Sequence, residues 1–300
     1  MLLRLTPLAF MKNVTSKSES ISMNLVELFD PKEEFIFKRI FGYDEEIFIS
    51  FANSALNYSD DKKIISVTFL NNEINKTAEN DKESRLDVHA ILKDGSHINI
   101  EMQIQNTGEY EKRSLYYWAK LYEMQLMEGE DYKNLSPAIC IHVLNFNLFK
   151  QKKNFHTVLA VVDLEIKDIF SKDFEINFME LPKVAKKMYN TLDKWMHFLK
   201  NPSKEEVNAM GDKTISKALD TLEYLSQDPV TRAQYEARKK YRLDYNTSIR
   251  VAKEEGIHIG EERGEYNKAI EIARAMRKLG LPLEVVRQTT GLSYDEIEKN

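Results

Sequence analysis

The feature that most constrains the fold is a pair of strand-like segments, residues 86–92 and 96–105, separated by Lys93-Asp94-Gly95. Two such runs joined by a short glycine-containing turn indicate a β-hairpin. In the second segment apolar and polar residues alternate, which predicts a strand with one buried face. The apolar residues are Ile98, Ile100, Met102 and Ile104, and the polar residues are Asn99, Glu101, Gln103 and Gln105.

The length of the turn decides which side chains face each other across this hairpin. A two-residue loop would place Asp87 opposite Met102, whereas a three-residue loop that ends in a left-handed Gly95 places Asp87 opposite Glu101. Glycine in the third position favours the longer loop, because glycine adopts the left-handed conformation at little cost. We therefore expect Asp87 and Glu101 on one face, with Gln103 two residues further along it.

The pair of carboxylates allows two interpretations. Acidic residues on an exposed strand face are common, so Asp87 and Glu101 could simply be solvated. Like charges opposite each other in a hairpin are destabilising, however, and a hard divalent ion such as Mg²⁺ would bind two such oxygen ligands while keeping several waters. Water bound to such an ion can attack a phosphate, and Gln103 could hold that water or a phosphate oxygen. Residue types alone leave both interpretations open.

The order of predicted elements is typical of an α/β domain over residues 24–182. Helices are predicted from the Asp30-Pro31 start to about Gly42, and again where apolar residues recur at helical spacing. Strands are predicted where β-branched or apolar runs are bounded by polar segments. The further helices are residues 45–56 and 109–127, and the further strands are residues 63–70, 137–144, 157–164 and 174–181.

Composition excludes several classes of protein. The 300-residue chain is 42% hydrophobic and 30% charged, which is ordinary for a globular protein, and it carries no run long enough to span a membrane. The net charge of −5 gives no general attraction to nucleic acid, so DNA binding would need a local basic patch. Cys140, the single cysteine, lies in an apolar run and predicts a buried thiol in a reducing compartment. We expect a cytoplasmic protein, with residues 1–23 forming a flexible leader.

The C-terminal part has a different character. Residues 183–250 are charged and predicted to be helical, with Trp195 and Phe198 among their apolar anchors. Residues 251–300 begin with Gly256, Gly260 and Gly264 at four-residue spacing. Each glycine costs about 1 kcal/mol inside a helix, so this stretch either is not helical or gains from close helix approach.

Two short helices around Gly291 close the chain, the second preceded by a capping pair formed by Ser293 and Glu296. This arrangement suggests a helix-turn-helix motif, but the second helix is acidic and would repel phosphate. We therefore expect residues 251–300 to be a packing or homo-oligomerisation element rather than a DNA-reading one.

Several segments together resemble a known family. An aspartate at the start of a hairpin followed by Glu-x-Gln resembles the core of PD-(D/E)XK nucleases, with Leu86-Asp87 and Glu101-Met102-Gln103 in the motif positions. More narrowly, the chain resembles the Rpn family of recombination-promoting nucleases and transposases. The matching segments are DPKEEFIFKRIFG (30–42), SFANSAL (50–56), RLDVHAILKDGSHINIEMQ (85–103), RSLYYWAKLY (113–122), MEGEDYKNLSPAICIHVLNF (127–146), FMELPK (178–183) and the C-terminal tail.

The resemblance implies a restriction-endonuclease-like α/β core, with a mixed central sheet flanked by helices and a helical C-terminal extension. It also implies a metal-dependent DNA endonuclease of weak or no sequence specificity that acts in recombination or transposition. Mg²⁺ is the expected cofactor, with Mn²⁺ or Ca²⁺ as alternatives. A non-catalytic DNA-binding or scaffolding protein that retains the nuclease fold is the alternative function.

Motif positions imply roles for individual residues. Asp87 and Glu101 would be metal ligands together with the Met102 backbone carbonyl, and Gln103 would stand where these nucleases usually have lysine. Nucleases of this fold often add an acid from the first helix, which would be Glu34 here, although the family usually has aspartate at that position.

The missing lysine leaves open which cation stabilises the transition state. Lys38, Arg85 and Arg113 are the candidates to contact DNA phosphate. Lysine and arginine at positions such as Lys38 and Arg113 are more often surface charges, and isolated surface ion pairs contribute little.

Overall fold

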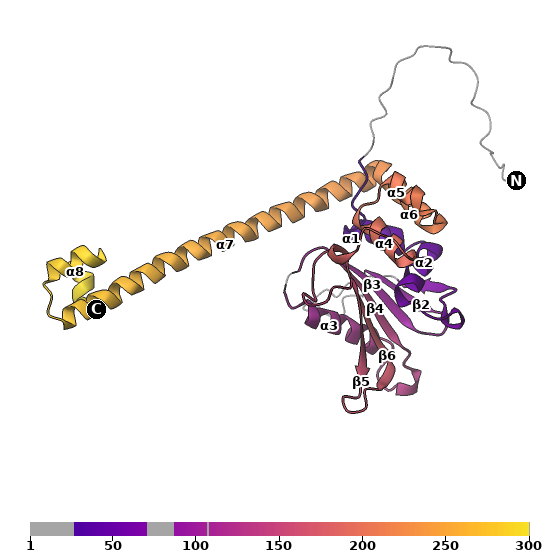
Figure 1. Cartoon of the computed structure of the whole chain (residues 1–300), viewed down its shortest axis with the longest axis horizontal. Coiled ribbons are helices and arrows are strands. Elements are labelled where there is room, and N and C mark those ends of the chain that lie inside the picture. Colours follow the sequence, from indigo (N-terminus) through magenta and orange to yellow (C-terminus); the bar gives the residue numbers. More distant parts are fainter. Residues whose placement is uncertain (1–26, 71–86, 107, 300) are drawn as a thin grey trace, which may run out of the picture. The chain divides into compact units, whose positions relative to one another are not determined.

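The computed structural model describes residues 27–70, 87–106 and 108–299 (Figure 1). Within these ranges a six-stranded mixed sheet is flanked by helices, which confirms the α/β class. The strand order is β1-β2-β3-β4-β6-β5; β3, β4 and β6 are parallel, and the outer pairings are antiparallel. The strands are β1 (Val67–Phe69), β2 (Val88–Leu92), β3 (His97–Gln103), β4 (Ala138–Leu144), β5 (His156–Val162) and β6 (Ile169–Glu180).

Helices precede, interrupt and follow the sheet. In the described residues no helix is long and apolar enough to cross a membrane. The α-helices are α1 (Glu34–Phe41), α2 (Glu45–Leu56), α3 (Tyr110–Glu123), α4 (Thr191–Lys200), α5 (Lys204–Met210), α6 (Lys213–Gln227), α7 (Pro229–Lys278), α8 (Leu283–Thr290) and α9 (Tyr294–Lys299), and the short 3-10 helices are η1 (Asp60–Lys62), η2 (Tyr132–Asn134) and η3 (Leu181–Lys183).

The β2–β3 hairpin has the register expected from its turn. Val88 pairs with Ile100, so the preceding residue, Asp87, comes opposite Glu101. Leu92 and Ser96 close the three-residue turn, and Gly95 has a φ of +88°, in the left-handed region. The three-residue loop is therefore confirmed. A local sequence signal, the position of one glycine, fixes which face Asp87 occupies.

Strand β3 is buried on both faces, whereas its alternation predicts one buried face and leaves open whether the polar face is solvated. Asn99 and Glu101, on the polar side, are 0% and 3% exposed. The reason is the sheet topology: β3 lies inside the sheet between β2 and β4, and helices α1 and α3 both contact it. The alternation of polar and apolar residues therefore identifies the polar face of β3 correctly, but this face is not exposed to solvent.

Helix α3 covers the face of the sheet that carries Glu101. Its apolar side, which includes Leu121, packs against Cys140 of β4 and Phe178 of β6 in one cluster. All three residues are fully or almost fully buried. The buried position expected for Cys140 is thus confirmed. On the opposite face Gly42, which follows α1, lies against Val88 of β2.

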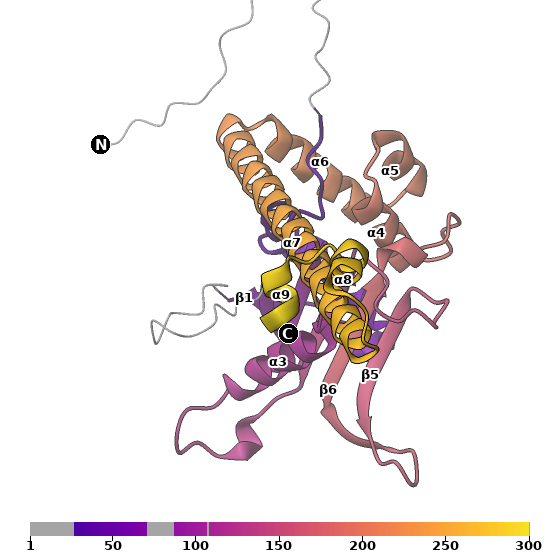
Figure 2. The ribbon, with the colours of Figure 1, turned by 90° about the vertical axis from the view of Figure 1, so that its left-hand side faces the viewer.

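Element boundaries differ from the expected ones where tertiary or turn contacts decide them. Helix α1 begins at Glu34 rather than at Asp30, because the Asp30 side chain accepts a hydrogen bond from the Lys32 N–H in a preceding turn. Strand β1 is shorter than residues 63–70. Strands β5 and β6 form a long hairpin that projects beyond the other strands (Figures 1 and 2).

The described chain separates into two compact units, before and after the boundary between Gln227 and Asp228. In the first unit α4 and α6 pack on α2, and Trp195 and Phe198 are fully buried, as expected. The second unit consists of α7, α8 and α9. Helix α7 runs continuously through Gly256, Gly260 and Gly264, and an added Cβ at any of these would meet no described atom within 4 Å. The expected leader, residues 1–23, lies outside the described residues.

Substituting Gly95 tests how strongly the turn holds the hairpin. A Gly95→Ala variant should lose about 1–2 kcal/mol through its left-handed backbone. A further loss is expected because the new Cβ would lie 3.1 Å from the Ser136 hydroxyl. Gly129 is the matched control, since it has the same φ of +88° but nothing within 4 Å of an added Cβ. Urea denaturation should show a larger loss for Gly95→Ala than for Gly129→Ala; equal losses would contradict the proposed role of the turn.

Candidate functional site

Asp87, which immediately precedes β2, and Glu101, near the end of β3, form a buried, hydrogen-bonded pair. Asp87 is 4% exposed and Glu101 is 3% exposed. The Asp87 N–H donates to Glu101 Oε1 at 3.1 Å, and the Met102 N–H donates to Asp87 Oδ2 at 2.8 Å. Asn99 Nδ2 adds a further hydrogen bond to Glu101 Oε1 at 2.8 Å. These contacts fix both carboxylates on one face of the hairpin.

Burial and mutual repulsion make the pair electrostatically costly. Burial raises the pKa of Asp87 to about 6, against the opposing effect of Lys38, and Glu34 raises it further. Burial and the neighbouring Asp87 raise the pKa of Glu101 well above its ordinary value. Each carboxylate therefore resists ionisation unless positive charge comes close.

Helix α1 brings one acidic and one basic side chain, Glu34 and Lys38, close to this pair. Lys38 Nζ lies 2.7 Å from Glu34 Oε1 and 3.2 Å from Asp87 Oδ1. Glu34 and Lys38 are four residues apart, so they share one face of the helix. Burial lowers the pKa of Lys38, but the two carboxylates outweigh this effect and raise it overall, so the ammonium is charged. The structure thus brings Glu34 and Lys38 to Asp87.

Arg113 of α3 approaches the same face of the sheet as Glu101. Its Nε donates to the Tyr117 hydroxyl at 3.0 Å, and its guanidinium lies over the rings of Tyr110 and Tyr117. The positive charge of Arg113 contributes to lowering the pKa of Glu101, although the burial effect is larger. Arg113 is therefore a half-buried, positioned cation rather than a freely solvated one.

His142, which was not among the expected site residues, lies beside Glu101 in the neighbouring strand β4. His142 is fully buried, and its Nδ1 lies 3.1 Å from the Tyr110 hydroxyl. Its Nε2 has no hydrogen-bond partner among the described residues, and the same holds for Asn99 Oδ1. No sequence signal identified His142, because the parallel register of β3 and β4 is not set by a local turn.

The two remaining expected site residues have different outcomes. The Gln103 side chain donates from Nε2 to the Gln105 carbonyl at 3.0 Å. Arg85 lies outside the described residues, so its expected place on the Asp87 face stays a prediction.

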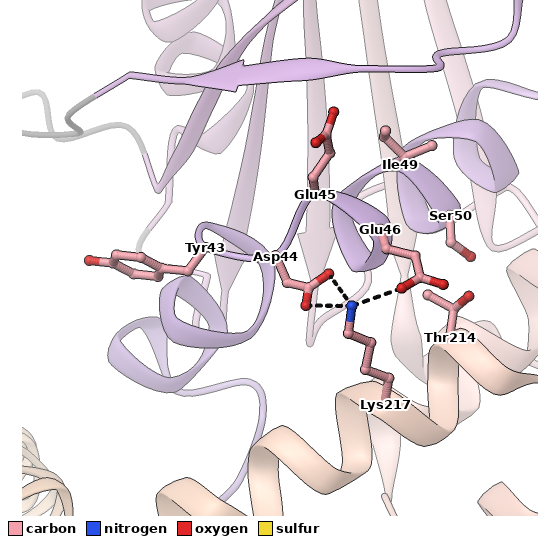
Figure 3. Close-up of a pocket in the computed structure, with 8 residues that line it drawn as sticks. All are labelled: Tyr43, Asp44, Glu45, Glu46, Ile49, Ser50, Thr214 and Lys217. Carbon is pink, nitrogen blue, oxygen red and sulfur yellow. Dashed lines mark hydrogen bonds and ion pairs between the residues drawn. The ribbon is translucent and has the colours of Figure 1, made fainter. Parts of the chain in front are cut away.

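A separate hollow of about 610 Å³ lies where the N-terminal end of α2 faces α6 (Figure 3). Asp44, Glu45 and Glu46 line it, and Lys217 pairs with Asp44 and Glu46, each at 2.8 Å. Three carboxylates against one lysine would repel phosphate, so this hollow is a poor site for nucleic acid.

The residues at the pair fit a divalent cation. No group of three or more His, Cys, Asp or Glu side chains in the described residues is arranged to hold a metal ion. Two carboxylates and the backbone carbonyl of Met102 would nevertheless suffice for Mg²⁺, which normally keeps several of its waters. Positive charge between Asp87 and Glu101 would also relieve the repulsion described above.

A mixed sheet with aspartate immediately before one hairpin strand and Glu-x-Gln near the end of the next is the arrangement expected of a nuclease core of the PD-(D/E)XK class. Comparison with family models agrees: residues 31–252 match the PD-(D/E)XK nuclease family transposase model. Because this match covers more than half of the chain, the protein belongs to that family. Neither the curated proteins nor the solved structures compared with the chain give a match.

The C-terminal tail requires a correction. Residues 267–300 match the model described as the C-terminal HTH domain of the Rpn/YhgA-like nuclease family, which confirms the Rpn resemblance. The expectation that the tail is not a helix-turn-helix element is therefore wrong. In the structure α8 and α9 flank a left-handed Gly291, and the expected capping pair of Ser293 and Glu296 is present. Glu296 is thus engaged in capping its own helix.

His142 should make stability pH-dependent. Burial, with a smaller contribution from Arg113, lowers the pKa of His142 to about 3, from an ordinary value of 6.5. The unfolded chain then binds a proton that the folded chain does not, so stability should fall as the pH drops from about 6.5 towards 3. The slope from one such group is up to about 1.4 kcal/mol per pH unit.

Replacing His142 should remove its contribution to the pH dependence of the free energy of unfolding. The raised pKa of Asp87 acts in the opposite sense, with stability lost as the pH rises from 3.8 through about 6. The informative quantity is therefore the difference between wild type and His142→Phe in urea denaturation at several pH values. His258→Phe, at an exposed position of α7, is the control. An unchanged slope in His142→Phe would contradict the assignment.

Proposed function

We propose that the protein is a metal-dependent DNA endonuclease that hydrolyses phosphodiester bonds in recombination or transposition. The observation that carries the proposal is the buried pair of Asp87 and Glu101, held side by side by the hairpin register. Membership of a nuclease family supports the same chemistry. Mg²⁺ is the proposed cofactor, with Mn²⁺ or Ca²⁺ as alternatives that also accept oxygen ligands.

Each residue near the pair has a proposed role. Asp87, Glu101 and the Met102 carbonyl would hold the metal, and Glu34 would add a further carboxylate from α1. When bound, the metal would activate water for attack on phosphorus and stabilise the developing charge. Gln103 would orient the water or a phosphate oxygen. This requires its amide to leave the Gln105 carbonyl.

The proposed partner is DNA, recognised with weak or no sequence specificity, and the proposed location is the cytoplasm. Lys38, Arg85 and Arg113 are proposed to contact phosphate oxygens, because local cations must offset a chain of net charge −5. The helix-turn-helix match at residues 267–300 gives a second element suited to DNA. The same match supports the alternative of a non-catalytic DNA-binding or scaffolding protein.

Replacing Asp87 separates these functions. Asp87→Asn should abolish Mg²⁺-dependent plasmid cleavage, with a loss of more than about a hundredfold, since even outer partners of metal ligands contribute 10- to 100-fold. DNA binding and the melting temperature should be retained, because the change removes a charge that burial disfavours. Asp131→Asn, at an exposed loop position, is the control. Cleavage that survives Asp87→Asn would refute the site, whereas wild type that binds DNA without cutting it would favour the alternative.

We also propose that the C-terminal tail forms homo-oligomers through α7. Apolar or small residues follow one face of this helix at three- and four-residue spacing up to Ile259 and again from Tyr266, with the charged Glu262 and Arg263 in between. The tyrosines and isoleucines among them up to Tyr266 are 43–74% exposed. The last turns of the same face, at Ile270 and Ala273, pack against residues of α8 and α9. A second copy of α7 would continue this packing, and Gly256 would permit close approach. The face consists of Tyr241, Tyr245, Ile249, Ala252, Gly256, Ile259, Tyr266, Ile270 and Ala273.

Two isoleucines of α7 provide a matched test of this association. Ile259 lies on the proposed face and is 48% exposed, whereas Ile257 lies on another side and is 51% exposed. Ile259→Lys should convert an oligomer into a monomer in light scattering coupled to size exclusion, and Ile257→Lys should not. A monomeric wild type, or equal effects of the two changes, would exclude this interface.

A further inference from the structure

We propose that Lys38 is an exchangeable counter-ion: its ammonium group pairs with the carboxylates of Asp87 and Glu34 until a divalent cation binds, and then leaves Asp87. This inference rests on the proposed metal site. Lys38 and the metal would compete for Asp87. Lys38 would also supply the positive charge that Gln103, an uncharged residue, does not provide.

The position of Lys38 supports the exchange. Its Nζ lies between carboxylates from two different elements, 3.2 Å from Asp87 Oδ1 and 2.7 Å from Glu34 Oε1. The side chain of Lys38 is 22% exposed, whereas that of Asp87 is 5% exposed. The ammonium thus lies between a buried carboxylate and solvent, at a place where it can leave without disturbing the sheet.

Charge makes the two cations mutually exclusive at Asp87. A divalent ion that coordinates Asp87 brings two positive charges to the carboxylate that already binds the ammonium. Like charges at short range in a partly buried site repel strongly. The divalent ion carries the larger charge, and it can also use Glu101 and the Met102 carbonyl, which Lys38 does not contact in a described hydrogen bond or ion pair. The ammonium is therefore the group that moves.

The released side chain would stay close to the site. Lysine is a compact charge on a flexible four-carbon stem, and α1 anchors its Cα beside the hairpin. Arg113 differs because Tyr117 and Tyr110 hold its guanidinium in place. Of these two cations, Lys38 is the one suited to exchange, and a phosphate oxygen beside the metal is the natural new partner for its ammonium.

A structural role for Lys38 gives different expectations. If Lys38 only held α1 against the hairpin, its removal would loosen the site and weaken metal binding and turnover together. If Lys38 competes with the metal, its removal should strengthen metal binding and still reduce turnover. The opposite directions of these two effects distinguish competition from support.

The test uses full-length protein with Lys38→Met, which keeps the apolar stem and removes the charge. Calorimetric titration with Mg²⁺, without DNA, should show about tenfold tighter binding than wild type, and plasmid cleavage at saturating Mg²⁺ should fall about a hundredfold. Lys112→Met is the matched control, because Lys112 pairs with Glu109 at 2.9 Å on the exposed side of α3. It should change neither quantity.

A second readout follows Lys38 itself. In protein with ¹³C-labelled lysine, the Cε resonance that is absent from Lys38→Arg should shift when Mg²⁺ is added, while the Lys112 resonance stays in place. Equal or weaker Mg²⁺ binding by Lys38→Met, or a Lys38 resonance that ignores Mg²⁺, would overturn the exchange while leaving the nuclease proposal intact. Wild type that binds no Mg²⁺ and cuts no DNA would overturn both.

Discussion

The candidate site depends on the register of the β2–β3 hairpin. A three-residue turn ending in left-handed Gly95 sets Asp87 opposite Glu101, and a shift by one residue would send Asp87 to the other face of the sheet. Because β3 is an inner strand, both carboxylates are buried. The same turn therefore brings the two acids together and imposes the electrostatic cost of burying them.

The surrounding residues offset this cost in two ways. Backbone N–H groups of Asp87 and Met102 and the amide of Asn99 donate hydrogen bonds to the carboxylates, which fixes their orientation. Positive charge approaches from two helices, with Lys38 at Asp87 and Arg113 near Glu101. The hydrogen bonds are built into the sheet, whereas the contact with Lys38 depends on a flexible side chain. Only the second can respond to a metal without a change of fold.

The parts of the structure that local chemistry decides could be predicted from the sequence. The glycine position predicted the hairpin register, the capping pattern predicted the Ser293–Glu296 pair, and the predicted range of α2 agrees with the observed helix. Residues that depend on long-range pairing could not be predicted in this way. His142 lies beside Glu101 through the parallel β3–β4 register, which no turn specifies. The burial of the polar face of β3 could not be predicted either, because alternation does not show whether a strand lies at the edge of a sheet or inside it.

The contact between Lys38 and Asp87 shows the same limit from another side. The two residues are far apart in the sequence, and only the packing of α1 beside the hairpin brings them within 3.2 Å. As a surface lysine, Lys38 would contribute little, because exposed ion pairs are weak and screened. Next to a carboxylate that burial keeps from ionising easily, the same ammonium changes the charge state of the site. The buried pair of acids is unfavourable by itself and therefore favours a bound cation. In this structure the Lys38 ammonium occupies that place at Asp87, and a metal would have to displace it.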